Sequence, residues 1–340
     1  FENKDYNEAE HARAVAKYLD TDHYDLYVSD ETLRSVIPLL PTIYDEPFAD
    51  PSQIPTYLVS KIAKEKVTVC LTGDGADELF GGYSRYSLAY RSWNKLKIFP
   101  LHFRKIIKFI CQGLPYGVWL FLFKIFRLSV GKLDRFLKAI NLLDCKSKVD
   151  FYHQGFMSQN NQASKWVLEK KSTEYRTAFD IYRSKCTDYY KDMMNLDLLH
   201  YMQADTLTKV DRASMFVSLE TRSPFLDPSV VQFSFTIPTK LKIKKYVNKY
   251  ILRKLLYKYI PREIVDRPKM GFSVPLSDWL RGPLKEWAEE MLDKDKLDRE
   301  GFFDSEIVTK KWNEHLSGKR NWHYQLWAVL MFQSWLDNNT

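Results

Sequence analysis

The sequence is poor in glycine and in long apolar runs. Only 12 of its 340 residues are glycine, against an average near 7%, which argues against a Gly-rich low-complexity chain and favours helices. The nearest approach to a long apolar run, Phe109–Phe123, contains Gly113, Pro115 and Gly117 and is followed by Lys124. A membrane-spanning helix needs about 18 or more apolar residues. We therefore expect no transmembrane segment.

Cysteine is scarce and widely spaced. The gaps between Cys70, Cys111, Cys145 and Cys186 are 41, 34 and 41 residues, which match neither a zinc site nor a dense disulfide scaffold. The seven histidines also lack zinc-binding spacing. The sequence starts without Met and without an apolar leader. We expect reduced thiols, a cytoplasmic location and a chain that is a fragment of a longer protein.

The net charge of +8 comes from a single stretch. Lys95–Lys148 contains 12 basic and 2 acidic residues, which leaves 39 basic and 41 acidic residues elsewhere. The bases alternate with large apolar residues, as in basic amphipathic helices. This favours helices packed on a core with a solvated basic face over peripheral contact with an anionic membrane. No helix-turn-helix, RNP or zinc-finger signature accompanies the charge, so we expect no nucleic-acid partner.

The first ninety residues predict an α/β arrangement, and the chain beyond Arg91 is mostly helical. Strands are expected over His23–Val28, which alternates, and over Val67–Thr72, whose continuous apolar run suits the middle of a parallel sheet buried on both faces. The last expected helix is apolar nearly all round and so should be buried. The expected helices are Asn7–Leu19, Glu31–Leu40 (ended by Pro41), Thr56–Lys64 and Trp322–Leu336.

A Gly-rich loop, GDGADELFGGY, directly follows the second strand. Such a turn at the carboxyl end of a parallel strand is where open α/β sheets bind ligands, and the backbone N–H groups at Gly73 and Gly75 suit a phosphate. Asp74, Asp77 and Glu78 would repel a bare phosphate unless Mg²⁺ lies between them. The loop has neither the Walker A nor the GxGxxG pattern. It predicts a metal–nucleotide site, with a simple turn capping the next helix as an equal alternative.

This loop resembles the signature of the synthetase domain of glutamine-hydrolysing asparagine synthetases, which are PP-loop ATP pyrophosphatases. The resemblance covers nearly the whole chain and is weakest across Lys95–Lys185. It implies an α/β fold with a doubly wound, mostly parallel sheet (PP-loop or HUP-like) that lacks its first strand, followed by a largely helical C-terminal part. The other matching blocks are Asp45–Pro55 (DEPFADPSQIP), Leu207–Asp227, Lys249–Arg253, Arg267–Pro275 and the closing HYQLWAVLMFQSW.

Three segments are expected within this synthetase domain. Residues 1–92 would form the α/β nucleotide-binding part, and residues 93–190 a basic helical segment. Residues 191–340 would form the helical remainder that completes the active-site cleft.

The resemblance implies an ATP-dependent ligase. Enzymes of this family activate the aspartate β-carboxylate with Mg-ATP to form β-aspartyl-AMP and pyrophosphate, and ammonia then displaces AMP to give asparagine. The ammonia comes from glutamine through an N-terminal glutaminase domain. Fixed cations near the leaving pyrophosphate stabilise the charge that accumulates there.

The resemblance also assigns site residues. Asp77 would hold Mg²⁺, and Thr72 and Gly73 would contact the AMP part of ATP. Asp74 stands where the family more often has Glu, a residue tied to the intermediate and to ammonia. Lys249 and Lys269 match two lysines that hold the pyrophosphate, which suits mobile ammonium groups.

A further group of charges recurs at helical spacing. Asp205, Lys209 and Arg212 would share one face of a helix, either as an ordinary i,i+4 salt bridge or as the border of the cleft. The resemblance favours the cleft, with Arg222 as an internal organiser. We leave the two alternatives open on the sequence.

Two parts of the family's proteins do not occur in this sequence. They are the Cys-initiated glutaminase domain, whose free amine acts as base, and the Ser-Gly-Gly-x-Asp-Ser loop. We expect the 340 residues alone to be unable to form aspartyl-AMP. The alternatives are a related ligase that adenylates another carboxylate, as in β-lactam or surface-polysaccharide synthesis, and a non-catalytic module whose basic helices bind a partner. Whether the chain forms a homodimer is left open.

Overall fold

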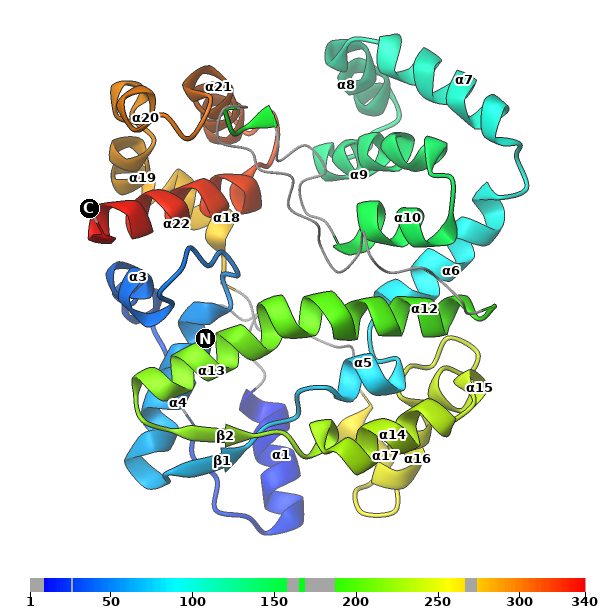
Figure 1. Ribbon diagram of the computed structural model, residues 1–340, viewed down its shortest axis with the longest axis vertical. Coiled ribbons are helices and arrows are strands. Elements are labelled where there is room, and N and C mark those ends of the chain that lie inside the picture. Colours follow the sequence, from blue (N-terminus) through cyan, green and yellow to red (C-terminus); the bar gives the residue numbers. More distant parts are fainter. Residues whose placement is uncertain (1–8, 26, 158–164, 169–186, 267–273, 340) are drawn as a thin grey trace. The chain divides into compact units, whose positions relative to one another are not determined.

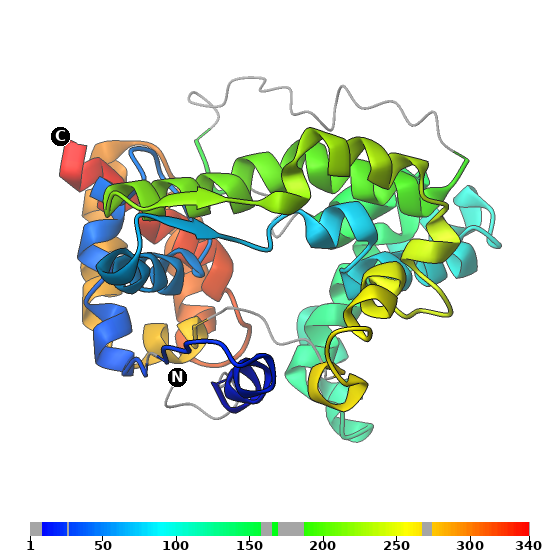
Figure 2. The same cartoon turned by 90° about the horizontal axis from the view of Figure 1, so that it is seen from below.

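The computed structural model describes residues 9–25, 27–157, 165–168, 187–266 and 274–339. Over these residues the protein is mixed α/β, mostly helical with one small parallel sheet (Figure 1). The sheet pairs β1 (Val69–Leu71) with β2 (Glu220–Arg222), in the register Val69 to Glu220 and Leu71 to Arg222. The two strands lie side by side in both views (Figures 1 and 2). The coarse class expected from the sequence is therefore confirmed.

The strand β1 is more exposed than its sequence predicts. The side chains of Val69 and Leu71 are 41% and 73% exposed, whereas the apolar run predicted burial on both faces. Residues 23–25 and 27–28, where the other strand was expected, have no regular secondary structure. The burial prediction was wrong because a parallel strand is buried only when strands flank it and helices cover both faces. The strand prediction was wrong because an alternating pattern does not supply a neighbouring strand. In the described part of the chain, β1 has β2 as its neighbour and no strand on its other edge.

The predicted helices form, but prolines do not end them as expected. The expected helix ended by Pro41 is instead three short turns, in which Pro38 and Pro41 stand at the start of a turn. Proline is tolerated there because the first turn leaves its N–H groups unbonded. Pro55 likewise lies in the first turn of α4 (Gln53–Lys66). The closing helix α22 (His323–Asn339) buries Leu326 and Trp327 completely, as predicted.

The chain divides into two compact units, each made from separate stretches. Unit 1 contains residues 1–83, 197–275 and 331–340, and therefore the sheet and the Gly-rich loop. In it, α13 packs against both α4 and β2 (Figure 2), and Leu79, Phe80 and Ile237 form a buried cluster. Its other elements are α1 (Ala9–Leu19), α2 (Asp30–Arg34), η2 (Ile37–Leu39), α3 (Leu40–Ile43), α5 (Ala76–Phe80), the π-helix η7 (Asp197–Leu207), α13 (Thr208–Phe216), η8 (Pro224–Leu226), α14 (Pro228–Thr236), α15 (Thr239–Lys242), α16 (Tyr250–Leu256) and α17 (Arg262–Val265).

Unit 2 contains residues 84–196 and 276–330 and is helical. Trp279 and Trp327 are among its largest fully buried side chains, and Leu142, Cys145 and Phe151 form a second cluster. In the described chain, no single helix is both long and apolar enough to cross a bilayer, although α7 and α8 pass that test as a pair bent by 92°. Its elements are α6 (Ser84–Leu96), α7 (Leu101–Gly113), α8 (Tyr116–Ile125), α9 (Val130–Asn141), η3 (Leu142–Asp144), α10 (Lys148–Tyr152), η4 (His153–Met157), α12 (Tyr189–Leu196), α18 (Leu276–Arg281), α19 (Lys285–Met291), α20 (Lys294–Glu300), α21 (Ser305–Leu316) and the first part of α22.

The described cysteines carry free thiols. Cys145 is buried, whereas Cys70 and Cys111 are half-buried, and Cys186 lies outside the described residues. Burial, helped by the Asp144 and Asp150 carboxylates, raises the pKa of Cys145 to about 11. Burial also raises the pKa of Cys70. Both thiols therefore remain protonated at neutral pH, as expected of structural cysteines.

Candidate active site

Glycines allow the loop after β1 to turn sharply into α5. Gly75, the N-cap of α5, has φ +87°, and Gly81, its C-cap, has φ +68°. Side chains other than glycine rarely adopt such angles. A Cβ on Gly75 would also lie 2.5 Å from Leu226 Cδ2. The two glycines thus place the loop at the carboxyl end of β1, the position expected of a ligand-binding loop.

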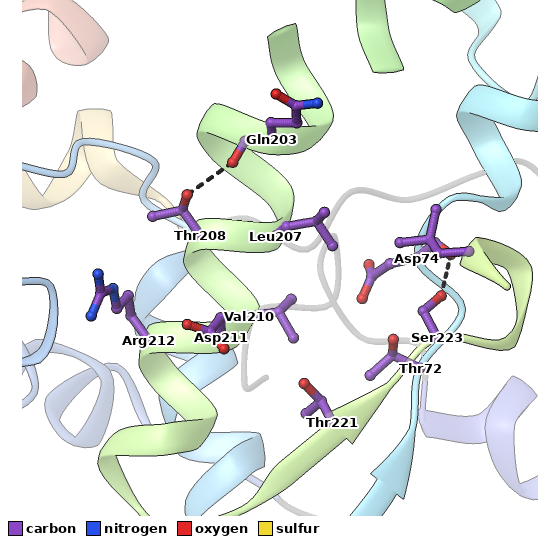
Figure 3. A pocket seen from close by; sticks show the side chains of 11 residues that line it. Thr72, Asp74, Gln203, Leu207, Thr208, Val210, Asp211, Arg212, Thr221 and Ser223 are labelled. Carbon is purple, nitrogen blue, oxygen red and sulfur yellow. Dashed lines mark hydrogen bonds between the residues drawn. The ribbon is translucent and has the colours of Figure 1, made fainter. Parts of the chain in front are cut away.

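A cavity of about 530 Å³ lies beside the ends of the two strands. Figure 3 shows Thr72, Asp74 and Ser223 on its strand side, facing Leu207 and Val210 across it. The Ser223 hydroxyl donates to the backbone carbonyl of Asp74. This hydrogen bond connects the segment that follows β2 to the Gly-rich loop that follows β1. The lining residues are Thr72, Asp74, Gln203, Leu207, Thr208, Val210, Asp211, Arg212, Thr221, Ser223 and Leu226.

The lining of this cavity is a mixture of hydroxyl, carboxylate and aliphatic groups. Ligand sites in proteins commonly combine apolar walls with a few polar groups that fix orientation. Thr72 and Asp74, two of the predicted site residues, are among these polar groups. Arg212 belongs to the lining, but its side chain leaves the helix on the side away from Asp74 (Figure 3).

The predicted metal ligand Asp77 contacts the predicted pyrophosphate ligand Lys249. Their Oδ1 and Nζ atoms are 3.0 Å apart, with the side chains 22% and 30% exposed. Lys249 is the N-cap of α16 and has a left-handed backbone with φ +51°, an uncommon conformation that clusters at functional sites. Neither residue lines the cavity. Tertiary structure therefore joins two candidates that are far apart in sequence.

Gly82 packs directly against this ion pair. A Cβ at residue 82 would lie 1.8 Å from Asp77 Oδ1 and 2.3 Å from Lys249 Cε. The Gly82 N–H donates to the Asp77 carbonyl at 2.7 Å, and its own carbonyl accepts from Asn248 Nδ2 at 3.1 Å. Only a residue without a side chain fits between the carboxylate and the lysine.

The third carboxylate of the loop is turned inward. Glu78 is 2% exposed and accepts a hydrogen bond from the Tyr83 hydroxyl at 2.5 Å. Burial raises the pKa of Glu78, and the Asp77 and Asp197 carboxylates add to this effect. The three acidic side chains of the loop thus have different surroundings. Asp74 lines the cavity, Asp77 contacts Lys249, and Glu78 is buried in the interior.

Two further predictions for the site concern a bound metal ion and Lys269. Within the described ranges, no three His, Cys, Asp or Glu side chains are grouped to hold a metal ion. Lys269, the second predicted pyrophosphate ligand, lies outside the described residues, as does most of the Arg267–Pro275 block. Its role stays a prediction.

Lys209 and Arg212 on α13 form ion pairs with the DEPFADPSQIP segment (Asp45–Pro55). The sequence did not predict these contacts. Lys209 Nζ lies 2.5 Å from Asp50 and 3.4 Å from Asp205, and Arg212 pairs with Asp45 at 2.7 Å. The i,i+4 spacing predicted the contact between Asp205 and Lys209. No local pattern indicates Asp50 or Asp45 as partners, because they come from a distant segment.

The role expected for Arg222 was wrong. Its side chain is 66% exposed and pairs with Glu220 at 2.7 Å. Residues i and i+2 of a strand point to the same face, and this face of β2 is open. The backbone carbonyl of Arg222 still accepts from the Thr72 N–H at 2.8 Å, which extends the sheet toward the loop.

The group around Lys209 perturbs two carboxyl pKa values in opposite directions. Burial and the neighbouring Asp50 carboxylate raise the pKa of Asp205 to about 7. Burial opposes ionisation of Asp50 as well, but Lys209 and Ser52 outweigh it and lower the pKa of Asp50. Near neutral pH the lysine therefore neutralises Asp50, while Asp205 holds a proton for part of the time.

We expect this protonation to make stability depend on pH. Asp205 binds its proton more tightly in the folded state, where its pKa is about 7, than at its ordinary value of 3.8. Between these values the folded state holds the extra proton, so the free energy of unfolding should fall as pH rises, by up to about 1.4 kcal/mol per pH unit. Asp205→Asn should flatten this slope. Urea unfolding of both proteins at about pH 5 and about pH 7 measures it, and equal slopes would contradict the assignment.

Comparisons with known proteins found a matching family model and several relatives. The sequence model of the family described as asparagine synthase matches residues 1–337. Asparagine synthetase [glutamine-hydrolyzing] 1 of Bacillus subtilis is 30% identical over 343 residues, which cover 98% of this chain and 50% of the relative. A putative asparagine synthetase [glutamine-hydrolyzing] of Mycobacterium tuberculosis (strain H37Rv) is 30% identical, covering 98% and 49%. The amidase chyE of Penicillium rubens is 23% identical, covering 89% and 46%. The chain spans about half the length of these relatives.

Proposed function

Because this chain belongs to the asparagine synthase family, we propose that it carries the synthetase part of an ATP-dependent amidation that converts aspartate to asparagine. The observation that carries the proposal is the contact between Asp77 and Lys249. Two groups that match the magnesium and pyrophosphate ligands of the family's enzymes meet here, Asp77 on α5 and Lys249 at the start of α16. Asp77 follows the same strand end whose Thr72 and Asp74 line the cavity.

The reaction has two steps. A β-carboxylate oxygen of aspartate attacks the α-phosphorus of ATP, and the bond to the bridging oxygen breaks, so pyrophosphate leaves with the electron pair. Ammonia then adds to the acyl carbon of β-aspartyl-AMP, the bond to the phosphate oxygen breaks, and AMP leaves as the nitrogen loses a proton. Each step moves negative charge onto a phosphate leaving group, which fixed cations stabilise.

We assign the first step to the residues around the loop. Thr72 and Gly73 would contact the AMP part of ATP, with Gly75 allowing the turn that brings the loop to the strand end. Lys249, and in our proposal Lys269, would neutralise the departing pyrophosphate. The Lys249 ammonium lies 3.0 Å from the Asp77 carboxylate. Asp74, at the cavity wall, would act beside the acyl intermediate and ammonia.

The residues present fit a magnesium ion bound through ATP. Mg²⁺ usually takes one or two protein carboxylates and fills its remaining positions with phosphate oxygens and water. Asp77, with 22% of its side chain exposed, offers one such carboxylate. Asp77 would hold the ion, which would supply positive charge to the phosphates.

We further propose that the 340-residue chain cannot form aspartyl-AMP by itself. The sequence lacks the Ser-Gly-Gly-x-Asp-Ser loop of the family, and the exposed Val69 and Leu71 of β1 would be covered in the larger doubly wound sheet of the family. Ammonia would come from glutamine through a glutaminase domain. ATP–pyrophosphate exchange by the 340 residues alone would show this proposal wrong.

Aspartate-dependent ATP–pyrophosphate exchange, measured in the gene product that carries this chain, tests the proposed function. Asp77→Asn should lower the exchange rate by about a hundredfold or more, because it removes the carboxylate that would hold the magnesium ion beside the phosphates. Asp298→Asn, an exposed carboxylate on α20, is the matched control and should leave the rate unchanged. Exchange with another carboxylate but not with aspartate would instead support a related ligase.

A further inference from the structure

The helix α7 is amphipathic, but two of its three charged residues, Arg104 and Lys108, face the protein. Arg104 is buried at 6% exposure and donates to the backbone carbonyls of Leu143 and Cys145 at 3.2 and 3.1 Å. One turn later, Lys108 donates to the Asn141 carbonyl at 3.1 Å and pairs with Asp144 at 2.7 Å. These contacts hold α7 in place through its polar side. The sequence had favoured the opposite arrangement, with the basic face in solvent.

The other side of α7 is apolar and exposed. The side chains of Phe103, Ile106, Phe109 and Ile110 are 49%, 56%, 80% and 59% exposed. Their spacing of three and four residues places them along one stripe of the helix. A helix of a soluble domain normally turns such a stripe toward the core. This stripe faces outward because Arg104 and Lys108 occupy the inner side.

The next helix, α8, also exposes apolar side chains. None of the ten residues of α8 (YGVWLFLFKI) is buried, and Phe121 and Ile125 are 65% and 58% exposed. The helix is held from its other side, where the rings of Trp119 and Phe123 lie 4.9 and 5.6 Å from that of Phe136 on α9. The outer face of α8 is thus fixed in an exposed position. Contiguous exposed apolar patches mark interaction sites.

The charge next to this surface has one sign. Lys105 and Lys124 are exposed and stand within one helical turn of Phe109 and Phe121. The two acidic residues of the whole Lys95–Lys148 stretch already have cationic partners: Asp144 pairs with Lys108 at 2.7 Å and Asp134 with Arg320 at 3.4 Å. The stretch therefore presents uncompensated positive charge around the apolar residues, which complements an anionic surface.

We propose that the outer face of α7 and α8 docks onto an anionic lipid membrane. We call this face the lipid-facing surface. It consists of six apolar residues and two lysines: Phe103, Ile106, Phe109, Ile110, Phe121, Ile125, Lys105 and Lys124. Aromatic and aliphatic side chains would enter the boundary between headgroups and acyl chains, and the lysines would contact lipid phosphates, as interfacial helices do. The two helices follow one another directly along the chain and meet at a bend of 92°.

Co-sedimentation of the 340-residue chain with vesicles tests this proposal. The chain should sediment with vesicles of phosphatidylcholine and phosphatidylglycerol at low salt, and less with phosphatidylcholine alone. The double variant Phe109→Ser/Phe121→Ser should bind about tenfold or more weakly, because each phenylalanine loses its apolar burial. The variant Lys105→Gln/Lys124→Gln should lose about tenfold on anionic vesicles only.

Matched controls distinguish vesicle binding by this surface from nonspecific binding by other exposed side chains. Phe233→Ser removes a phenylalanine that is 62% exposed on α14, outside the surface, and Lys240→Gln removes an exposed lysine on α15. Both should bind vesicles as the parent chain does, and circular dichroism should show all variants folded. Equal binding by the double phenylalanine variant, or no binding to anionic vesicles, would overturn the proposal. The proposal would also be overturned if the chain did not bind vesicles but self-associated, and Phe109→Ser abolished the self-association. The surface would then join two copies of the chain.

Discussion

Replacing Lys249 by methionine should slow aspartate-dependent pyrophosphate release by about a hundred- to a thousandfold, the loss seen when one preorganised stabiliser of transition-state charge is removed. Methionine matches the lysine side chain as far as its ε-carbon and removes the ammonium that lies 3.0 Å from Asp77. The effect should fall mainly on kcat, because pyrophosphate charge grows as the bond breaks and the lysine acts most strongly in the transition state.

The stability of this variant should change little. The pair of Lys249 and Asp77 is partly exposed, and such pairs contribute at most about 1 kcal/mol to the free energy of unfolding. Lys258→Met, an exposed lysine beyond the end of α16, is the matched control and should keep its exchange rate. A Lys249→Met enzyme with the parent rate would exclude this lysine from the pyrophosphate site, although the chain's family membership would be unaffected.

Replacing Gly82 by alanine should break the same pair by steric force alone. The new Cβ would overlap Asp77 Oδ1, at 1.8 Å, and Lys249 Cε, at 2.3 Å. Both overlaps involve flexible side-chain atoms of a partly exposed pair, so we expect the carboxylate and the ammonium to move apart. The variant should lose no more than about 1 kcal/mol of stability, as expected when such a pair is broken, and should lose exchange activity by at least about tenfold.

Gly73→Ala is the matched control for stability. It lies in the same loop, but its Cβ would meet no atom within 4 Å, so its free energy of unfolding should stay within about 0.5 kcal/mol of the parent. Urea unfolding measures both variants. Combining Gly82→Ala with Lys249→Met should cost less activity than the sum of the two, because both remove one interaction. Full additivity would show that Gly82 acts independently of the pair.

Local patterns explain which parts of the fold were predictable. The apolar spacing in α1 and α22 and the sequence before Gly73 predicted helices and a strand correctly, because periodicity reports which side chains share a face. His23–Val28 has the pattern of a strand but forms none in its described residues. A strand needs a neighbour to bond its backbone, and an amino-acid pattern does not supply one.

The candidate site divides in the same way. The Gly-rich loop and its carboxylates were visible in the sequence because a turn after a buried-type strand has a recognisable composition. The different surroundings of the three carboxylates were not visible in the sequence. Asp74, Asp77 and Glu78 lie within five residues, yet they contact a cavity, a lysine and a tyrosine, respectively. The attachment of Asp50 to Lys209 was also invisible, because it joins segments with no shared pattern.

By itself, the sequence determined the family, the residue types of the loop and the location of the positive charge, all of which depend on residue types and their spacing. The tertiary structure alone decided that Lys249 rests on Asp77, that Gly82 leaves no room for a side chain, and that α7 turns its apolar stripe outward. The physical reason is that charge pairing, steric exclusion and burial depend on distances between side chains. Those distances are set by how helices pack, which the order of residues along one helix does not reveal.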